Sequence, residues 1–228
     1  MIAVADLVLA LDTPDPGAAT RLLDAVPAVR WVKIGSVLFT QAGPAFVAKL
    51  KARGLKLFLD LKWHDIPNTV RGAVEEAKSL GVDLVTVHTL GGAVMMAAAK
   101  AAAGPGVAVV GVTVLTSHDE VALSAILGRE AEPAIEVVRL ARAARGAGLD
   151  GVVASPLEVA RLRSLLGPTA LLVAPGIRPA GAAKADQVRT ATAAEAAAAG
   201  ADLLVVGRPV LESPDPAKAW AQIAAELG

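Results

Sequence analysis

Short apolar runs recur along the whole chain, and longer segments rich in alanine separate them. Most of the runs are β-branched or leucine-rich and lack alternating polar residues, which is the pattern of parallel strands buried on both faces. Eight such runs are present, at residues 7–11, 31–34, 55–61, 84–87, 107–115, 151–154, 170–174 and 203–206. Each run is therefore predicted to be a strand of one largely parallel sheet.

The segments between the runs have the periodicity of amphipathic helices. Apolar residues three or four positions apart include Ala18, Leu22 and Val26 in one segment and Val70, Val74 and Ala77 in another. A strand followed by a helix, repeated along the chain, predicts an α/β fold of the (β/α)8 TIM barrel type. Because no linker interrupts the pattern, we expect residues 1–228 to form a single (β/α)8 barrel catalytic domain.

Glycine marks four of the predicted turns from helix to strand, at Gly54, Gly81, Gly148 and Gly200. A helix commonly ends with a residue in the left-handed conformation, which glycine adopts without steric cost. We interpret these turns as structural elements at the bottom of the barrel and not as a nucleotide-binding motif.

The composition narrows the class of ligand. Lysine plus arginine equals aspartate plus glutamate, at 22 each, so no net field attracts nucleic acid or an anionic membrane, and a small molecule is the expected ligand. The chain has no cysteine, which excludes disulfides, thiolate metal sites and cysteine nucleophiles. With no basic N-terminal region and no apolar run near the ~20 residues of a membrane span, we expect a cytoplasmic protein.

Polar residues follow the predicted strands where a barrel of this type builds its active site, at the C-terminal ends. Asp12 follows the first strand, Lys33 lies in the second, and Asp60 and Lys62 end the third. Further polar residues end the next strands at His88, Thr89, Thr113, Thr116, Ser117 and Ser155. Lysines at this level are costly to desolvate unless anions lie close, so this edge is predicted to be functional.

The loops after the seventh and eighth strands each combine glycine with arginine. Pro175, Gly176 and Arg178 follow the seventh strand, and Gly207 and Arg208 follow the eighth. Glycine lets backbone N–H groups approach phosphate oxygens, and arginine can bind them in a bidentate fashion. We therefore expect a phosphorylated substrate, with residues 177–187 forming a loop that closes over it.

Simpler interpretations of single residues remain open at this stage. Asp65 could cap a helix that begins near Pro67, Lys33 could extend toward solvent, and Asp12 could only initiate a turn. Two histidines, His64 and His88, are expected to be hydrogen-bonded structural residues, and His118 a solvated loop residue. No histidine pair has the i, i+4 spacing of a zinc site, so no metal is expected.

The stretch at residues 60–69, Asp-Leu-Lys-Trp-His-Asp-Ile-Pro-Asn-Thr, resembles the D-x-K-x-x-D-I-P-N-T signature of the orotidine 5′-monophosphate decarboxylase family. Shorter matches occur in the family's order and span nearly the whole chain. They are Leu9-Ala10-Leu11-Asp12, Val32-Lys33-Ile34-Gly35, Val114-Leu115-Thr116-Ser117, Pro175-Gly176-Ile177-Arg178-Pro179, Asp186-Gln187 and Val206-Gly207-Arg208-Pro209.

This resemblance implies a homodimeric barrel that converts orotidine 5′-monophosphate to uridine 5′-monophosphate and carbon dioxide, the last step of de novo pyrimidine synthesis. It implies no metal and no organic cofactor. The catalytic residues would be Lys33, Asp60, Lys62 and Asp65, with Lys62 protonating C6 of the pyrimidine. Asp65 and Thr69 would come from the partner chain, so that each active site is composite.

The resemblance also implies a substrate-binding set. Asp12 and Lys33 would hold ribose hydroxyls, as would Thr69 from the partner chain. Thr116 and Ser117 would meet the pyrimidine edge. Phosphate would be bound by Arg178, Gln187, Gly207 and Arg208. Ile66, Pro175 and Gly176 complete the set.

Two other functions are weighed against this one. The first is a related barrel enzyme that acts on keto-sugar phosphates and uses magnesium, such as a hexulose-phosphate synthase; residues 66–69 and 175–179 favour the nucleotide enzyme. The second is a catalytically silent barrel that only binds a phosphorylated metabolite or a protein. The alternating charges at Lys33, Asp60, Lys62 and Asp65, which we expect to be buried, argue against a protein that binds its ligand without catalysing a reaction.

Overall fold

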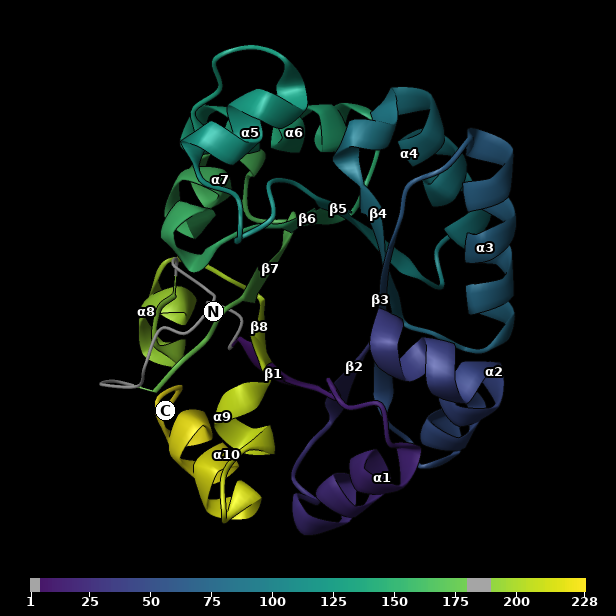
Figure 1. Ribbon diagram of the computed structural model, residues 1–228, viewed down its shortest axis with the longest axis vertical. Coiled ribbons are helices and arrows are strands. Elements are labelled where there is room, and N and C mark those ends of the chain that lie inside the picture. Colours follow the sequence, from purple (N-terminus) through teal and green to yellow (C-terminus); the bar gives the residue numbers. More distant parts are fainter. Residues whose placement is uncertain (1–4, 180–189) are drawn as a thin grey trace.

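The computed structural model of the protein describes residues 5–179 and 190–228. Within these residues, eight parallel strands close into a barrel in sequence order. They are β1 (Asp6–Ala10), β2 (Trp31–Gly35), β3 (Lys56–Trp63), β4 (Leu84–His88), β5 (Ala108–Val112), β6 (Gly151–Val153), β7 (Leu171–Pro175) and β8 (Leu203–Val206). The strands form a ring and the helices surround it (Figure 1). The predicted (β/α)8 barrel is confirmed.

The helices lie on the outside of the ring; most connect consecutive strands, and the last two follow β8 (Figure 1). The α-helices are α1 (Pro16–Ala25), α2 (Ser36–Ala52), α3 (Pro67–Ser79), α4 (Gly92–Ala103), α5 (Glu120–Leu127), α6 (Pro133–Gly146), α7 (Val159–Leu166), α8 (Ala193–Ala198), α9 (Arg208–Leu211) and α10 (Pro216–Ala225). Short 3-10 turns, η1 (Thr89–Gly91) and η2 (Pro156–Glu158), precede α4 and α7. Both helical patterns seen in the sequence are confirmed, and α3 buries its predicted face of Val70, Val74 and Ala77. Within the described residues, no helix is both long and apolar enough to cross a membrane.

Two strand ends differ from the sequence prediction by more than one residue. Strand β3 continues two residues further than predicted, so Asp60 and Lys62 lie within it. Strand β5 ends at Val112, although the apolar run continues to Leu115. Val114 and Leu115 are apolar because they line a cavity at the end of the strand, not because they pair in the sheet.

The apolar core lies on both sides of the barrel wall, because successive strand residues point to opposite faces. Side chains such as Val32, Leu59 and Val85 point outward and pack against the helices. Alternate positions fill the barrel interior, and they include Val8, Ala10, Phe58, Leu84, Val110, Val173, Leu203 and Val205. This interior layer forms a packed floor below the C-terminal ends of the strands.

An aspartate repeats at three turns at the bottom of the described barrel. The carboxylates of Asp83, Asp150 and Asp202 accept hydrogen bonds from the backbone N–H groups of Leu57, Val109 and Leu172, at 2.7 to 2.8 Å. Each also pairs with a cation from a neighbouring helix: Lys51, Lys100 and Arg163 respectively. The glycines Gly54, Gly81, Gly148 and Gly200 have φ between 74° and 98°, as the helix ends require. These turns tie neighbouring strands together at the end opposite the polar residues.

Candidate active site

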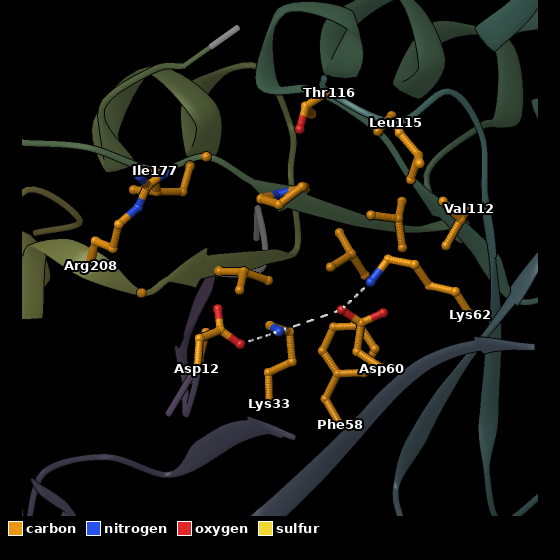
Figure 2. Close-up of a pocket in the computed structure, with 18 of the residues that line it drawn as sticks. Asp12, Lys33, Phe58, Asp60, Lys62, Val112, Leu115, Thr116, Ile177 and Arg208 are labelled. Atoms are coloured by element: carbon orange, nitrogen blue, oxygen red, sulfur yellow. Dashed lines mark hydrogen bonds and ion pairs between the residues drawn. The ribbon is translucent and has the colours of Figure 1, made fainter. Parts of the chain in front are cut away.

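A cavity of about 540 Å³ opens at the C-terminal ends of the strands. Its size lies in the range of small-molecule sites, about 300–1,000 Å³. Figure 2 looks into it and shows side chains from several strand ends pointing toward one space. The predicted residues that line it are Asp12, Lys33, Asp60, Lys62, Thr116, Pro175, Gly176, Arg178, Gly207 and Arg208.

Four side chains of alternating charge form a row along one wall of this cavity (Figure 2). The Nζ atom of Lys33 lies 2.9 Å from Oδ1 of Asp12 and 3.5 Å from Oδ2 of Asp60. The Nζ atom of Lys62 lies 2.8 Å from the same Oδ2 of Asp60. The row therefore runs Asp12, Lys33, Asp60, Lys62, with each inner charge between two opposite charges. The simpler interpretations of Asp12 and Lys33, a turn and a side chain extended to solvent, do not account for this pairing.

The two inner members of the row are buried, and their charges depend on their neighbours. The side chains of Lys33 and Asp60 are 12% and 10% exposed. Burial alone would lower the pKa of Lys33, but the carboxylates of Asp60 and Asp12 outweigh it and raise the pKa above its usual value. Burial would raise the pKa of Asp60, but the ammonium groups of Lys33 and Lys62 hold it below its usual range. Both groups are therefore charged at neutral pH.

Gly35, at the end of β2, leaves the space that this row needs. A Cβ atom at this position would lie 3.2 Å from Nζ of Lys33 and 3.4 Å from Oδ1 of Asp12. A side chain would therefore press on the contact between the ammonium and the carboxylate. The absence of a side chain at residue 35 helps to keep the first ion pair of the row in place.

Two arginines line the cavity, and Arg208 lies across it from Lys62 (Figure 2). Arg208 begins α9 directly after β8, and Figure 2 shows it on the opposite side from Lys62, with Asp12 and Lys33 between. Arg178 is 9% exposed, and its backbone N–H donates to the carbonyl oxygen of Ala191 at 2.9 Å. Arg208 places positive charge at one end of the cavity, Lys62 places it at the other, and Arg178 also lines the cavity (Figure 2).

Several predicted site residues lie outside the cavity of their own chain. Asp65, Ile66 and Thr69 are exposed in the segment that leads from β3 into α3, and Ser117 is exposed after β5. The capping interpretation of Asp65 is wrong, because Ile66 is the N-cap of α3 and makes no side-chain cap bond. The carboxylate of Asp65 instead accepts a hydrogen bond from the adjacent N–H of Ile66, at 2.6 Å. Gln187 lies outside the described residues.

Other cavity residues did not stand out in the sequence. Phe58, Val112, Val153, Val173 and Val205 form the apolar floor, and each lies on a predicted strand. Phe58 could have been identified from the sequence, because it lies two residues before Asp60 on the same strand and therefore points to the same face. Glu212, an acid in the cavity lining just after α9, had no distinguishing pattern around it.

The histidines lie beside the charged row. The rings of His64 and His88 stack with centroids 5.5 Å apart, and Nδ1 of His88 accepts a hydrogen bond from the N–H of Leu90 at 3.4 Å. Burial, together with the nearby charges of His64, Lys62 and His118, lowers the pKa of His88 to about 4. His118 lies in a loop, as predicted, but it is half-buried and lines a small cavity with His88. Within residues 5–179 and 190–228, no three His, Asp or Glu side chains gather as a metal site.

Comparison with known proteins gives consistent matches along the chain. Residues 5–223 match the sequence profile of the Orotidine 5'-phosphate decarboxylase / HUMPS family. The chain is 55% identical over 219 residues to an orotidine 5'-phosphate decarboxylase of Anaeromyxobacter sp. (strain K), and 96% of each chain is covered. It is 52% identical over 225 residues to the enzyme of that name from Halorhodospira halophila, with 97% of this chain and 95% of the relative covered. The crystal structure of orotidine 5'-phosphate decarboxylase from Lactobacillus acidophilus is similar with a TM-score of 0.87 and 36% identity, over 98% of this chain and 99% of that one.

Proposed function

The chain belongs to the orotidine 5'-phosphate decarboxylase / HUMPS family, and from this premise we propose that it converts orotidine 5'-monophosphate to uridine 5'-monophosphate and carbon dioxide. The relatives at 46% to 55% identity all carry the name of this decarboxylase. The observation that carries the proposal within this chain is the charged row that ends at Lys62, on the cavity wall opposite Arg208.

The chemistry of decarboxylation explains the need for a cation beside the reacting carbon. When the bond between C6 and the carboxylate breaks, the electron pair stays on C6, and the pyrimidine ring delocalises it poorly. Lys62 supplies a positive charge for this pair and then a proton, which forms the new C6–H bond. A pair of unit charges ~4 Å apart interacts by roughly 4 kcal/mol at an effective dielectric of 20. One contact is too weak for efficient catalysis, so the preorganised charges act together.

Asp60 has a double role in this proposal. Its carboxylate orients the Lys62 ammonium, from which it lies 2.8 Å away. It also lies where the substrate carboxylate would approach, and the repulsion between the two anions ends once neutral carbon dioxide leaves. Destabilisation of the bound substrate then adds to stabilisation of the carbanion.

We assign the opposite end of the cavity to the 5′-phosphate. Arg178 and Arg208 can bind phosphate oxygens in a bidentate fashion, and the neighbouring Gly176 and Gly207 allow close approach of the backbone. Asp12 and Lys33 lie between Arg208 and Lys62 (Figure 2), where they would meet the ribose hydroxyls. Phosphate binding far from C6 can then contribute to catalysis by positioning the pyrimidine against Lys62.

We propose that the enzyme works as a homodimer with composite sites. Asp65 and Thr69 are exposed outside the cavity of their own chain, where a second copy could receive them. Exposed apolar side chains occur at the starts of two helices that pack together: Ile66, directly before α3, is 67% exposed, and Val94, in the first turn of α4, is 74% exposed. Exposed apolar groups beside polar site residues are a common feature of protein interfaces. The partner would supply its Asp65 to the charged row and its Thr69 to the ribose.

Reaction without a metal or an organic cofactor is also part of the proposal. The family includes HUMPS enzymes as well as the decarboxylase, and a keto-sugar phosphate reaction supported by magnesium is the competing function. In the proposed reaction, the ammonium of Lys62 provides the cation that a metal would otherwise supply.

Ultraviolet absorbance during incubation with orotidine 5′-monophosphate tests the proposal. We expect conversion to uridine 5′-monophosphate that a chelator does not slow. Lys62→Ala should abolish this turnover while it leaves the binding of uridine 5′-monophosphate largely intact. No conversion by folded wild-type protein, or conversion only with added magnesium, would refute the proposal; near-normal turnover by the variant would remove Lys62 as the proton donor.

A further inference from the structure

Lys62 has an unusual backbone conformation. Its φ is 51°, and among the described residues no other non-glycine residue has a positive φ. Such a conformation costs about 1–3 kcal/mol in a non-glycine residue and persists where the surroundings enforce it. The pairing of β3 with β4 is irregular at the same point, with a register shift between Leu59 and Trp63. Some part of the structure must therefore hold Lys62 in place.

Thr86 on β4 makes the contacts that can do this. Its side chain is fully buried, and its hydroxyl oxygen accepts a hydrogen bond from the backbone N–H of Lys62 at 2.9 Å. The same hydroxyl donates to Oδ1 of Asp60, also at 2.9 Å. A hydroxyl has one donor and can accept as well, and an ionised carboxylate only accepts, so the direction of both bonds is fixed.

The two contacts serve different parts of the charged row. Oδ2 of Asp60 faces the ammonium groups of Lys62 and Lys33. Thr86 binds the other oxygen, Oδ1, and so fixes the rotation of the carboxylate. Because it also holds the backbone of Lys62, a single hydroxyl sets the position of both members of the ion pair.

Thr86 is a polar residue at a position of β4 that faces the apolar interior of the barrel. Leu84, two residues earlier, fills the barrel interior, and Phe58 opposite it on β3 does the same. Thr86 is the next inward position of β4, directly above this apolar layer. A valine would fill the same volume, but it would leave the N–H of Lys62 and Oδ1 of Asp60 without this partner, which is costly in a buried site.

We propose that Thr86 is a positioning residue for the reaction, one that holds the Asp60 carboxylate and the Lys62 backbone in their working geometry. This inference rests on the proposed function. Thr86 does not line the cavity, so it acts through the two residues that it binds. Misplacement of a reacting group by ~1 Å can lower a rate by about 100-fold.

Three variants at this position test the inference by steady-state kinetics with orotidine 5′-monophosphate. For Thr86→Val we expect kcat to fall by about 100-fold with KM changed less than about threefold, since the phosphate and ribose contacts remain. Thr86→Ser should recover most of the loss, and Thr86→Ala should not. The Ser and Ala variants both lack the γ-methyl group and differ only in the hydroxyl, so they decide the question even if the Val variant does not fold.

Thr20→Val is the control. Thr20 lies on α1 outside the cavity, it is half-buried, and its hydroxyl donates to the carbonyl oxygen of Pro16 at 2.8 Å. We expect its kcat to stay near that of wild type. Wild-type kcat in a folded Thr86→Ala variant, or equal losses in the Ser and Ala variants, would overturn the inference.

A crystal structure of a Thr86 variant without the hydroxyl separates this inference from the proposed function. We expect the Lys62 backbone or the Asp60 carboxylate to be displaced from its wild-type position. Unchanged positions of both would overturn the inference whatever substrate the enzyme uses. Absence of wild-type turnover on orotidine 5′-monophosphate would instead refute the proposed function and leave this structural measurement decisive for Thr86.

Discussion

At the scale of single residues, the site depends on charged side chains at buried positions, where an apolar side chain would have no desolvation cost. Lys33 and Asp60 are each buried, and each is tolerated because an opposite charge lies on either side. Removing one member takes a partner from each charge beside it, and a buried charge that loses a partner is destabilised. The row is therefore a unit, and the contributions of its members will not be additive.

Arg208 allows a residue-scale test of the phosphate assignment. For Arg208→Ala we expect kcat/KM on orotidine 5′-monophosphate to fall by about 10- to 100-fold, the loss of one charge-assisted contact of ~1.5–3 kcal/mol. Turnover of the nucleoside orotidine, which has no phosphate, should change little. Steady-state rates on both substrates measure the difference. Arg161→Ala, an exposed arginine on α7, removes the same charge far from this loop and serves as the control; equal losses on both substrates would contradict the assignment.

His88 predicts a pH dependence of stability. Its pKa of about 4 lies below the usual value of 6.5, first because of burial and then because of nearby positive charges. As the pH falls from about 6.5 to about 4, the unfolded chain therefore takes up a proton that the folded protein does not, and stability is lost over this window. Above pH 6.5, His88 does not contribute to the pH dependence of the free energy of unfolding.

His88→Asn should flatten this dependence. The asparagine oxygen can still accept the N–H of Leu90, as Nδ1 does, but the side chain does not titrate. Urea unfolding at several pH values between 7 and 4.5, at fixed protein concentration, measures the slope. Asp60 does not interfere, because its pKa lies below its usual value and its stabilising effect is lost only at lower pH. An unchanged slope in the variant would show that His88 is not the group responsible.

At the scale of elements, the aspartates at the bottom of the barrel join neighbouring strands to each other and to a helix. Asp150 accepts the N–H of Val109 at 2.7 Å and contacts Lys100 through both oxygens, also at 2.7 Å. For Asp150→Ala we expect the free energy of unfolding to fall by about 2 kcal/mol, because the N–H loses a charged acceptor. For Asp150→Asn, which keeps an acceptor, about half that loss is expected. Urea denaturation measures both losses. The kcat of each variant should not change, because the cavity lies at the other end of the barrel. Wild-type stability of the Ala variant would contradict this role of Asp150.

The elements themselves could be predicted from the sequence because their cause is local. Apolar runs without alternating polar residues predicted the strands, and glycines predicted the helix ends. Gly81, for example, has a φ of 74° at the end of a helix. The predicted end of β5 was wrong because residues that line the cavity, such as Val114 and Leu115, are as apolar as residues inside a strand. The irregularity in β3 could not be predicted, because it depends on Thr86, which is distant in sequence and lies on another strand.

The site shows the same division between local and nonlocal causes. Asp60 and Lys62 are two positions apart on one predicted strand, so their spacing predicts the same face, but the left-handed conformation of Lys62 does not follow from that spacing. The contact of Lys33 with Asp12 and Asp60 depends on the pairing of β2 with β1 and β3, which are separate segments of the sequence. Glu212 in the cavity lining follows only from the path of the chain after β8, which no periodicity encodes.

At the scale of the whole molecule, the exposed segment at Asp65 and Thr69 is the feature that one chain leaves unexplained. We expect two inactive variants, Lys62→Ala and Asp65→Ala, to regain activity when mixed. In a mixed dimer, one site combines the intact Lys62 of the Asp65→Ala chain with the intact Asp65 of its partner, and the other site lacks both. Random exchange of equal amounts makes about half of the dimers mixed, so roughly a quarter of wild-type activity should return.

The measurement is the initial rate on orotidine 5′-monophosphate after the two variants are incubated together. Subunit exchange must be demonstrated independently, for example with one variant carrying a charge tag that separates mixed dimers on ion exchange. A mixture of Lys62→Ala with a Lys62→Ala, Asp65→Ala double variant is the matched control, because no combination of these chains contains an intact Lys62. Recovery only in the first mixture requires that the two residues act in one site from different chains. With exchange demonstrated, no recovery would mean that each chain uses its own Asp65, and that the exposed position of this residue must change when the substrate binds.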